Sequence, residues 1–421
     1  MTMYGLPEEV KFCKRCTISN QRPNSCVEHN NTPNSKKETI HFDEEGVCSA
    51  CRVAEQKETI DWDARDAELR ALCDKHRRSD GGYDCIVPGS GGKDSFKQTW
   101  LLRYVYGMNP LTVTWAPNLY TEWGRRNHKA WIDSGFDNIL VTPAGNIHAI
   151  LTRLSIEKLF HPFQPFILGQ KMLAPMMAAK FGIKLIFYGE NEAEYGNPRA
   201  DLTTALRDAS YYTEANDSDV FLSGISLSEL SDSYGVDRKH LNFYLPPPPE
   251  SVKGIEVHYL GYYMPWSPLT SYNFVASMAA VSGIDWGIAE ERTAGTFTDW
   301  NSIDDMIDDL HYWTTYIKFG IGRATYDSCQ AIRNGEMTRK DAVKKVRQYD
   351  GEFPNRFMDE ICRHLTISSV LNPEVEAAFT SRGIPLEFSK TRLLWLADKF
   401  RPPHLWETSA AGVFVLAHTV K

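Results

Sequence analysis

The sequence lacks three features that would have set its location or its partners. It has no apolar run of about 18 residues, the length that a membrane-spanning helix requires. The stretch 1–11 has no basic segment followed by an apolar one, so we expect no secretory signal. Lys and Arg number 46 against 54 Asp and Glu, and the net charge of −8 gives no overall basic surface for nucleic acid. We therefore expect a cytoplasmic protein that neither inserts into a membrane nor binds nucleic acid.

The composition is otherwise that of a globular protein with a large core. Hydrophobic residues make up 42% and charged residues 24% of the chain, which are ordinary proportions. The 421 residues are enough for two to three domains of common size.

Nine cysteines are present, and four of them form two C-x-x-C pairs: Cys13, Cys16, Cys48 and Cys51. Without a signal peptide, such pairs favour a metal over disulfides, and each pair is the usual half of a four-cysteine zinc site. The insert 17–47 contains His29 and His41, which are alternative ligands but are more typical of free polar residues. A redox pair is the other interpretation, and no βαβ unit precedes the cysteines to support it. We predict structural zinc.

A glycine-rich turn follows the apolar run 83–87 and precedes a predicted helix over 93–106. Strand, glycine-rich turn and helix is the geometry that aims backbone N–H groups at an anion. A Walker A loop needs glycine at the position of Val87 and Ser or Thr at the position of Asp94, so this turn is not one. The dinucleotide fingerprint needs glycine at the position of Asp94 and is excluded as well. The segment Ser90-Gly-Gly-Lys-Asp-Ser95 instead resembles the SGGxDS signature of the PP-loop ATP pyrophosphatases, which split ATP between its α- and β-phosphates.

Short apolar runs and helical stretches alternate after this loop. The pattern predicts strands at 111–115, 138–142 and 184–188, with helices at 122–134, 147–160 and 168–181. Repeated βα units of this length predict a parallel sheet with helices on both faces. Ligands of such sheets bind at the carboxyl ends of the strands.

An acidic segment, Gly189-Glu-Asn-Glu-Ala-Glu-Tyr-Gly196, follows the last of these strands directly. Its three carboxylates and one amide are oxygen ligands of the kind that Mg²⁺ with ATP needs. It is similar to the G-x-N-x-x-D/E element of PP-loop enzymes. A solvated acidic loop is the alternative, but the position after a strand favours a substrate or magnesium site.

The aromatic cluster 257–266 is compatible with a core strand or with stacking against a sugar or base. Further on, a helix is predicted over 301–311 with Ser302 as its N-cap. Its four aspartates are spaced to allow a metal-binding face, but most are interpreted as capping residues and a solvated face: Asp304, Asp305, Asp308 and Asp309.

Lys318 and Arg323 bracket a Gly-x-Gly turn that could cradle a phosphate or carboxylate. A helix C-cap with exposed basic residues is the alternative. Helices are predicted over 338–349, 354–365 and 385–400, so the last hundred residues are expected to be mainly helical.

Taken in order, these motifs closely resemble the N-acetyl sugar amidotransferases, the WbpG/PseA-like proteins of bacterial surface-glycan pathways (lipopolysaccharide, O-antigen or flagellin glycosylation). The resemblance runs from about residue 10 to about residue 370 and also includes Gly295-Thr-Phe-Thr298, Tyr316–Thr325 and Arg339–Gly351. It implies a zinc-binding module over 1–60, a PP-loop domain of the adenine nucleotide α-hydrolase-like type over 61–260, and a substrate-binding, mainly helical region over 261–421.

The family implies conversion of a sugar acetamido group, on a nucleotide-linked sugar, into an acetamidino group with ATP, Mg²⁺ and ammonia. The amide oxygen would be adenylated with release of pyrophosphate, and ammonia would then displace AMP. The implied phosphate-binding groups are the backbone N–H groups of Gly91 and Gly92 and the hydroxyls of Ser90 and Ser95.

The remaining implied roles fall on charged and amide side chains. Lys93 would neutralise phosphate charge, and Asp94 would hold Mg²⁺ or the loop itself. Asn191 and Glu194 would orient the acetamido group or the metal. The implied substrate-binding residues are Glu190, Asn191, Lys318 and Arg323.

The sequence shows no nucleophile elbow and no Cys–His–Glu set of a glutaminase, and Thr2 rather than cysteine follows Met1. Ammonia should therefore come from a separate glutaminase with a HisF-like partner, as the resemblance implies. Two other functions compete with this one: a PP-loop enzyme that thiolates or amidates a tRNA base, and a zinc-stabilised nucleotide-binding scaffold without activity. The acidic balance, with no basic patch interleaved with aromatics, disfavours the first.

Overall fold

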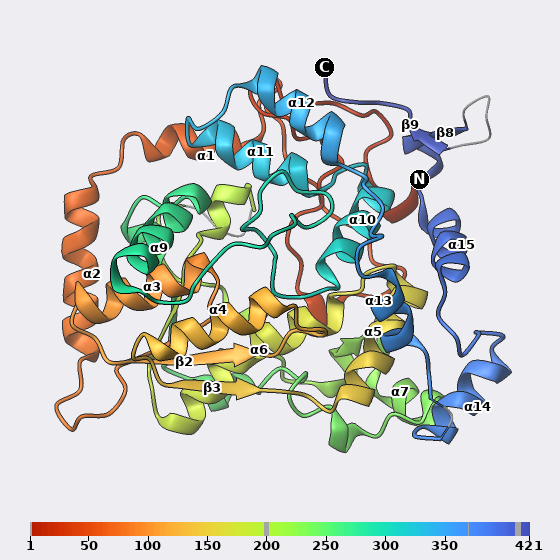
Figure 1. Cartoon of the computed structure of the whole chain (residues 1–421), viewed down its shortest axis with the longest axis horizontal. Coiled ribbons are helices and arrows are strands. Elements are labelled where there is room, and N and C mark those ends of the chain that lie inside the picture. The colour runs from red at the N-terminus through yellow and green to blue at the C-terminus, as the bar shows by residue number, and fades with distance from the viewer. Residues whose placement is uncertain (1, 198–201, 369, 409–413) are drawn as a thin grey trace.

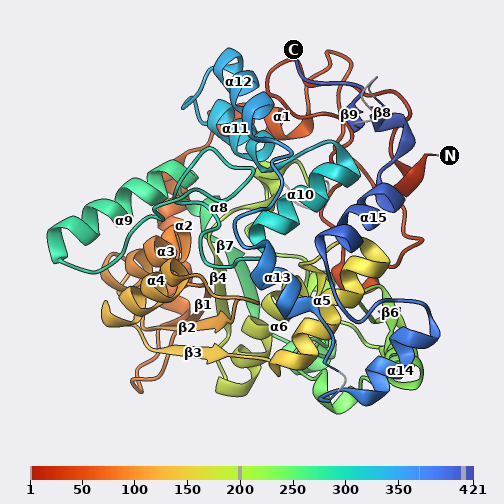
Figure 2. The same cartoon turned by 45° about the vertical axis from the view of Figure 1, so that its right-hand side comes forward.

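A five-stranded parallel sheet organises the computed structural model, which describes residues 2–197, 202–368, 370–408 and 414–421 (Figures 1 and 2). Its strands are β1 (Cys85–Pro88), β2 (Pro110–Trp115), β3 (Asn138–Val141), β4 (Leu185–Tyr188) and β7 (Glu256–Tyr259). Every neighbouring pair is parallel, and the order across the sheet is β3-β2-β1-β4-β7. The predicted parallel sheet is confirmed, and the aromatic cluster supplies its fifth strand.

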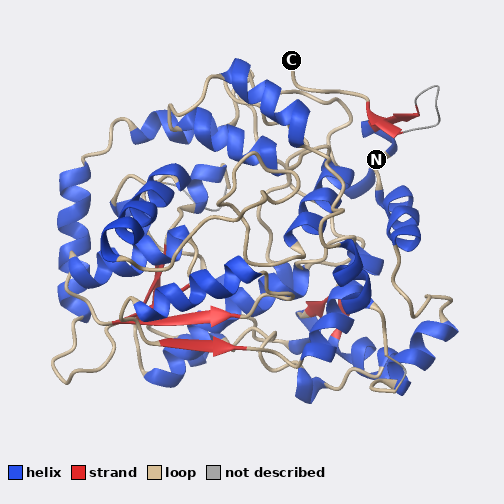
Figure 3. Ribbon diagram, in the orientation of Figure 1, coloured by secondary structure: helices blue, strands red, loops and turns tan. Residues whose placement is uncertain are grey.

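Helices cover both faces of this sheet, as Figure 3 shows. Successive side chains of a strand point to opposite faces, so Ile86 packs in one core and its neighbours Cys85 and Val87 in another. The first core contains α5 (Gly145–Leu159) and α6 (Gln164–Phe181). The second contains α2 (Trp62–His76), α3 (Lys93–Tyr104), α4 (Glu122–Asp133), α8 (Leu260–Tyr263) and part of α9 (Pro268–Ser282).

The order of the strands sets the place of the site. From β1 the chain adds β2 and then β3 toward one edge, and it crosses to the other side of β1 for β4 and β7. The carboxyl ends of β1 and β4 therefore lie at the point where the direction of strand addition reverses. Ligands of open parallel sheets bind at such a point.

Residues between β4 and β7 form short elements, in keeping with the irregular sequence there. They include the hairpin of β5 (Phe221–Leu222) and β6 (Ile225–Ser226), followed by α7 (Leu227–Tyr234). Among the described residues, no helix combines the length and the apolar character that crossing a bilayer would require.

The C-terminal region is mainly helical, as predicted. Its elements are α10 (Asp308–Phe319), α11 (Arg323–Arg333), α12 (Arg339–Tyr349), α13 (Met358–Leu365), α14 (Pro373–Ser381), α15 (Lys390–Phe400) and the hairpin of β8 (Trp406–Thr408) and β9 (Phe414–Leu416). At the other end of the chain, α1 (Ser49–Lys57) begins within the second cysteine pair and lies beside α11 and α12 (Figures 1 and 2).

The predicted helix over 301–311 is wrong. Ser302 has a φ of 52°, outside the right-handed helical region, and α10 begins only at Asp308. The Asp305 carboxylate accepts hydrogen bonds from the backbone N–H groups of Asn118 (2.6 Å) and Leu119 (3.2 Å), in the loop after β2. This contact with a distant part of the chain keeps residues before Asp308 out of the helix. Local sequence patterns do not reveal such a contact.

Candidate active site

A cleft of about 680 Å³ lies at the carboxyl ends of β1 and β4. Three distant parts of the chain supply most of its lining: the turn after β1, the turn after β4, and the C-terminal region. The lining residues of these parts are Gly89, Ser90, Gly92, Lys93, Asp94 and Ser95; Gly189, Glu190, Glu192 and Tyr195; and residues 300–304 with Arg323. The two motifs found in the sequence therefore share one cleft, as predicted.

The glycine-rich turn is held by hydrogen bonds between its backbone and the side chains of Ser95 and Trp286. Gly91 has a φ of +86°, and a side chain there would place its Cβ 2.6 Å from the carbonyl oxygen of Asn127. The Ser95 hydroxyl accepts a hydrogen bond from Gly91 N–H and donates one to the Gly92 carbonyl, both at 3.2 Å. Trp286 Nε1 donates to the Gly91 carbonyl at 3.0 Å. The Gly91 N–H, predicted to bind phosphate, is thus engaged by Ser95, whereas Gly92 lines the cleft.

Lys93 and Asp94 are the first two residues of helix α3, and both line the cleft. The Lys93 ammonium lies 2.7 Å from Asp94 Oδ2 and 5.0 Å from the centre of the Trp300 ring. Its side chain is only 10% exposed, so its charge acts in a poorly solvated place. The second carboxylate oxygen, Asp94 Oδ1, is buried and has no hydrogen-bond partner.

Glu190 is the carboxylate of the acidic turn that reaches the cleft nearest to Asp94. Burial, followed by the negative charge of Asp94, raises the pKa of Glu190. The Tyr195 hydroxyl donates a hydrogen bond to Glu190 Oε2, and Gln330 Nε2 from α11 donates to that hydroxyl at 3.0 Å. The positions of Glu190 and Tyr195 are therefore tied to the C-terminal region.

Asn191 and Glu194 hold the acidic turn and do not line the cleft. Asn191 Oδ1 accepts a hydrogen bond from Ala193 N–H at 3.0 Å and caps the short 3₁₀ helix η3 (Glu192–Tyr195). Glu194 forms an ion pair with Lys57 of α1 at 2.8 Å. Their predicted contact with substrate or metal stays a prediction, and the geometry does not bring either side chain to the cleft.

The two basic residues around the Gly-x-Gly turn have different surroundings. Arg323, the first residue of α11, lines the cleft, and its Nε donates to Asp327 Oδ1 at 2.7 Å. Lys318 is buried elsewhere: its Nζ donates to the Leu159 carbonyl at 2.7 Å, and burial lowers the pKa of Lys318 to about 7. Gly320 between them is the C-cap of α10. Substrate contact by Lys318 stays a prediction that this geometry does not favour.

A side cavity of about 470 Å³ shares Ser90, Glu190 and Arg323 with the cleft. Asp305 and Asp308 line it. The exposed fractions of Asp305, Asp308 and Asp309 are 3%, 9% and 0%, so their interpretation as a solvated face is wrong.

Burial changes the acidity of these aspartates. It raises the pKa of Asp305 to about 6, and together with the charge of Asp304 it raises the pKa of Asp308. Burial also raises the pKa of Asp309, although its ion pair with Arg356 at 3.0 Å opposes this shift. The side cavity therefore carries carboxyl groups that take up a proton more readily than exposed ones.

Among the lining residues that were absent from the sequence predictions are Trp286, Lys171 and Arg207. A signal for Lys171 existed, because it is the only charged residue of the first sixteen in the apolar helix α6. Neither Trp286 nor Arg207 belongs to a recognisable motif, and only the folded chain brings them to the cleft.

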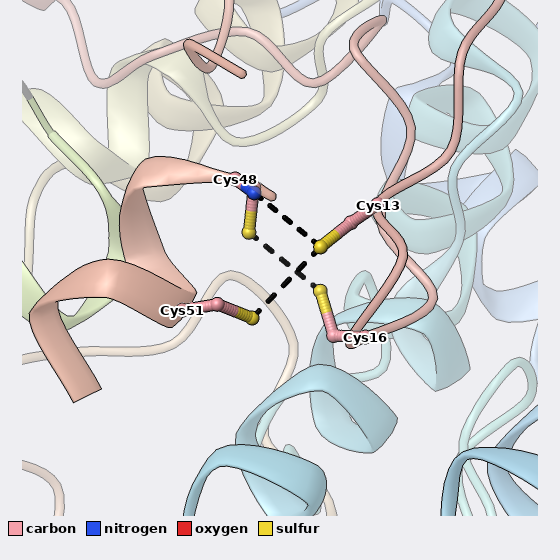
Figure 4. A group of neighbouring side chains, drawn as sticks. All are labelled: Cys13, Cys16, Cys48 and Cys51. Carbon is pink, nitrogen blue, oxygen red and sulfur yellow. Dashed lines mark hydrogen bonds between the residues drawn. The ribbon is translucent and has the colours of Figure 1, made fainter. Parts of the chain in front are cut away.

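The four predicted cysteine ligands form one cluster, with their sulfurs directed at one another (Figure 4). The Sγ atoms of Cys13 and Cys51 are 4.0 Å apart, and those of Cys16 and Cys48 are 3.7 Å apart. Tetrahedral zinc with Zn–S bonds of about 2.3 Å separates its sulfurs by about 3.8 Å. Backbone N–H groups of Cys48 and Arg15 donate to Cys13 Sγ at 3.3 and 3.4 Å, which favours a thiolate. The cluster could therefore bind zinc, without help from either histidine of the insert.

This cysteine module lies between the acidic turn and the C-terminal helices. On one side, the Ser49 hydroxyl of α1 donates to the Gly196 carbonyl at 3.3 Å, next to the Lys57–Glu194 ion pair. On the other, the Thr17 hydroxyl lies 3.2 Å from Cys329 Sγ of α11. Folding of the module should therefore influence the position of the acidic turn.

Fold and site together define an α/β protein with a parallel sheet, a glycine-rich loop that opens on a polar cleft, and a four-cysteine cluster that could bind zinc. Residues 294–421 match a family model described as LPS biosynthesis protein WbpG-like, C-terminal domain. No curated protein matches the chain. The family match covers less than a third of the chain and supports the WbpG-like part of the resemblance. The description of that family indicates a protein of LPS biosynthesis.

Proposed function

We propose that this protein is an ATP-dependent amidotransferase that converts the acetamido group of a nucleotide-linked surface-glycan sugar into an acetamidino group. One observation carries the proposal: Trp300, Asp304 and Arg323 belong to the region that matches the WbpG-like model, and they line the same cleft as Ser90–Ser95. The region that matches the WbpG-like model and the glycine-rich loop thus contribute to a single cleft, which supports the proposal. A general nucleotide-binding scaffold would not need this convergence.

The proposed first step activates a poor electrophile. The amide oxygen of the substrate attacks the α-phosphorus of ATP, the bond to the β-phosphate oxygen breaks, and pyrophosphate leaves. The Gly92 N–H, the Ser90 hydroxyl and the Lys93 ammonium stand on the cleft side of the loop and would stabilise charge on the leaving pyrophosphate. Fixed donors in a poorly solvated place act more strongly than donors in water.

Asp94 and Glu190 fit a magnesium ion that accompanies ATP. Asp94 Oδ1 is a buried acceptor without a partner, and burial, followed by repulsion from the negative charge of Asp94, raises the pKa of Glu190. A hard divalent cation prefers carboxylate oxygens and would relieve this repulsion. When bound, the ion would neutralise part of the negative charge of the phosphates.

In the proposed second step, ammonia attacks the carbon of the adenylated amide, its nitrogen loses a proton, and AMP leaves. The sequence contains no recognisable glutaminase set, so ammonia would come from a separate glutaminase with a HisF-like partner. Arg323 lies at the junction of the cleft and the side cavity, where it would contact the acidic or nucleotide-linked part of the sugar.

The test is a reaction of the purified full-length chain with ATP, Mg²⁺, an ammonium salt and a panel of UDP- and CMP-linked acetamido sugars. We expect pyrophosphate release that depends on both sugar and ammonium, with a product whose mass falls by the replacement of oxygen with NH. Release that requires tRNA would favour the competing function. Absence of release with every sugar, even with a glutaminase present, would reject the proposal.

A further inference from the structure

One end of the cleft is built by residues that the steps above do not use. The insert 17–47 contributes Ser25, Cys26 and Glu28 to it, and α6 contributes Lys171. Arg207 completes this part of the lining. The insert between the cysteine pairs therefore forms part of the wall of the cleft.

The two cations at this end have different partners. Arg207 forms an ion pair with Glu192 at 2.9 Å and its side chain is 6% exposed, so its charge is compensated. Lys171 forms no ion pair and no hydrogen bond within the part of the chain that the structure describes. Its Nζ lies 5.2 Å from the centre of the Tyr211 ring. Burial, and next the charge of Arg207, lower the pKa of Lys171, and the carboxylates of Glu28 and Glu192 oppose this shift only in part.

Glu28 gives the same wall a hydrogen-bond acceptor. Its carboxylate accepts hydrogen bonds from Cys26 Sγ (3.1 Å) and Asn31 Nδ2 (3.4 Å), one on each oxygen. An ionised carboxylate offers about four acceptor positions, so positions remain for the hydroxyl groups of a ligand. A cation beside such an acceptor suits a sugar that carries a negative charge.

This end of the cleft is electrostatically distinct from the glycine-rich loop. The charges that act most on Glu190 are those of Asp94, Lys93 and Arg323. The charges that act most on Lys171 are those of Arg207, Glu28 and Glu192. Phosphates bound at the loop would therefore act little on Lys171, and within the described residues neither Glu28 nor Glu192 forms an ion pair with it.

We propose that Lys171 binds an anionic group of the sugar substrate, and that the insert 17–47 with Glu28 forms the wall that selects this sugar. The nature of the ligand rests on the proposed function. Two sources offer the same chemistry: a carboxylate on the sugar ring, or a phosphate of its nucleotide carrier. Lys171 is then a specificity-determining residue, and the insert takes part in substrate recognition besides carrying the cysteines.

The experiment measures binding of the full-length, zinc-loaded chain to UDP-N-acetylglucosamine and to its C6 uronate by calorimetry. The variants are Lys171→Met, Lys171→Arg and, as a matched control on the exposed end of α6, Lys180→Met. If the sugar carboxylate is the ligand, the wild type binds the uronate about 10-fold or more tightly than the neutral sugar, as a charge-assisted hydrogen bond warrants. Lys171→Met removes that preference, while Lys171→Arg and Lys180→Met keep it.

If the carrier phosphate is the ligand, Lys171→Met weakens both nucleotide sugars about 10-fold or more and by equal factors. An unchanged affinity of Lys171→Met for both probes would overturn the proposal, and so would a wild type that binds neither. Pyrophosphate release is followed separately. Lysine-dependent binding, with no release from any sugar of the panel even when a glutaminase is present, would reject the proposed reaction and leave the anion site standing.

Discussion

The two main walls of the cleft are built in opposite ways. The loop wall, Ser90–Ser95, comes from six consecutive residues and is shaped by hydrogen bonds between the Ser95 hydroxyl and the loop backbone, and by one positive φ at Gly91. The C-terminal wall, with Trp300, Asp304 and Arg323, is drawn from a stretch that holds its place through contacts with the loop after β2 and with the cysteine module. The comparison teaches that the glycine-rich loop is a local structure, whereas the C-terminal wall is assembled only by folding.

The walls also differ in the polar and charged groups that they contain. The loop wall offers backbone N–H groups and a lysine that is already close to an aspartate. The side cavity beside the C-terminal wall contains buried carboxyl groups, and burial raises the pKa of Asp305 to about 6. Such groups lower the free energy of unfolding when they are ionised, so their presence beside a cleft is a sign of function rather than of stability.

The largest effect is expected at the loop wall, from Gly91→Ala. The new Cβ would meet the Asn127 carbonyl oxygen at 2.6 Å, and a φ of +86° costs an alanine about 1 kcal/mol or more. Because displaced donors no longer match the transition state, we expect pyrophosphate release to fall about 100-fold or more.

Gly92→Ala is the matched control for this change. Its Cβ would meet only the Ser90 hydroxyl, at 3.7 Å, and its N–H is retained. We expect activity within a few-fold of the wild type. Equal losses in both variants would show that the loop is not the rigid, backbone-shaped wall described above.

The next effect concerns the cysteine module, which contacts the acidic turn and helix α11. Cys48→Ser should lose bound zinc, measured by elemental analysis, and lower the free energy of unfolding by about 3 kcal/mol or more. Cys362→Ser, outside the cluster, is the control and should change neither quantity. Full zinc content in Cys48→Ser would contradict a four-cysteine site.

A smaller effect is expected from Arg323→Ala on the C-terminal wall. Loss of a charge-assisted contact should raise the KM for the sugar or lower kcat about 10-fold, with ATP binding retained. The exposed Arg363→Ala is the control. Unchanged KM and kcat for the sugar would reject the role of Arg323 and leave the loop wall as the main determinant of the site.

The smallest effect is expected at Lys318, where the test is whether its buried side chain affects stability or contacts the substrate. Its pKa is lowered to about 7 by burial, so between about pH 7 and pH 10 the unfolded chain binds a proton there that the folded chain does not. The free energy of unfolding should therefore rise with pH in this window, by about 1 kcal/mol or more.

The variant Lys318→Met should flatten this rise, and the exposed Lys340→Met should not. Denaturant titrations at pH 7, 8 and 9.5 measure the difference. A changed sugar KM in Lys318→Met, with an unaltered pH profile, would instead restore its predicted contact with substrate.

The sequence predicted the loop, the acidic turn and the cysteine cluster because each consists of short motifs with a recognisable order of residues. The helix predicted over 301–311 failed because Asp305 bonds to backbone N–H groups nearly 190 positions earlier. Lys318 and Arg323 are five residues apart, and the sequence gives no reason to assign them different surroundings. Lys318 is nevertheless buried against Leu159, whereas Arg323 reaches the cleft. Burial of a charge depends on the partner surface, which periodicity and spacing do not describe.

Three things were determined by the sequence alone: a parallel α/β sheet, a glycine-rich loop at the end of its first strand, and a four-cysteine cluster. These follow from local periodicity, from the steric freedom of glycine and from ligand spacing. Only the tertiary structure decided which side of the acidic turn faces the cleft, which basic residue reaches it, and that the insert 17–47 forms a wall beside Lys171. Those features depend on side chains brought together over long sequence separations, where packing rather than local sequence sets the outcome.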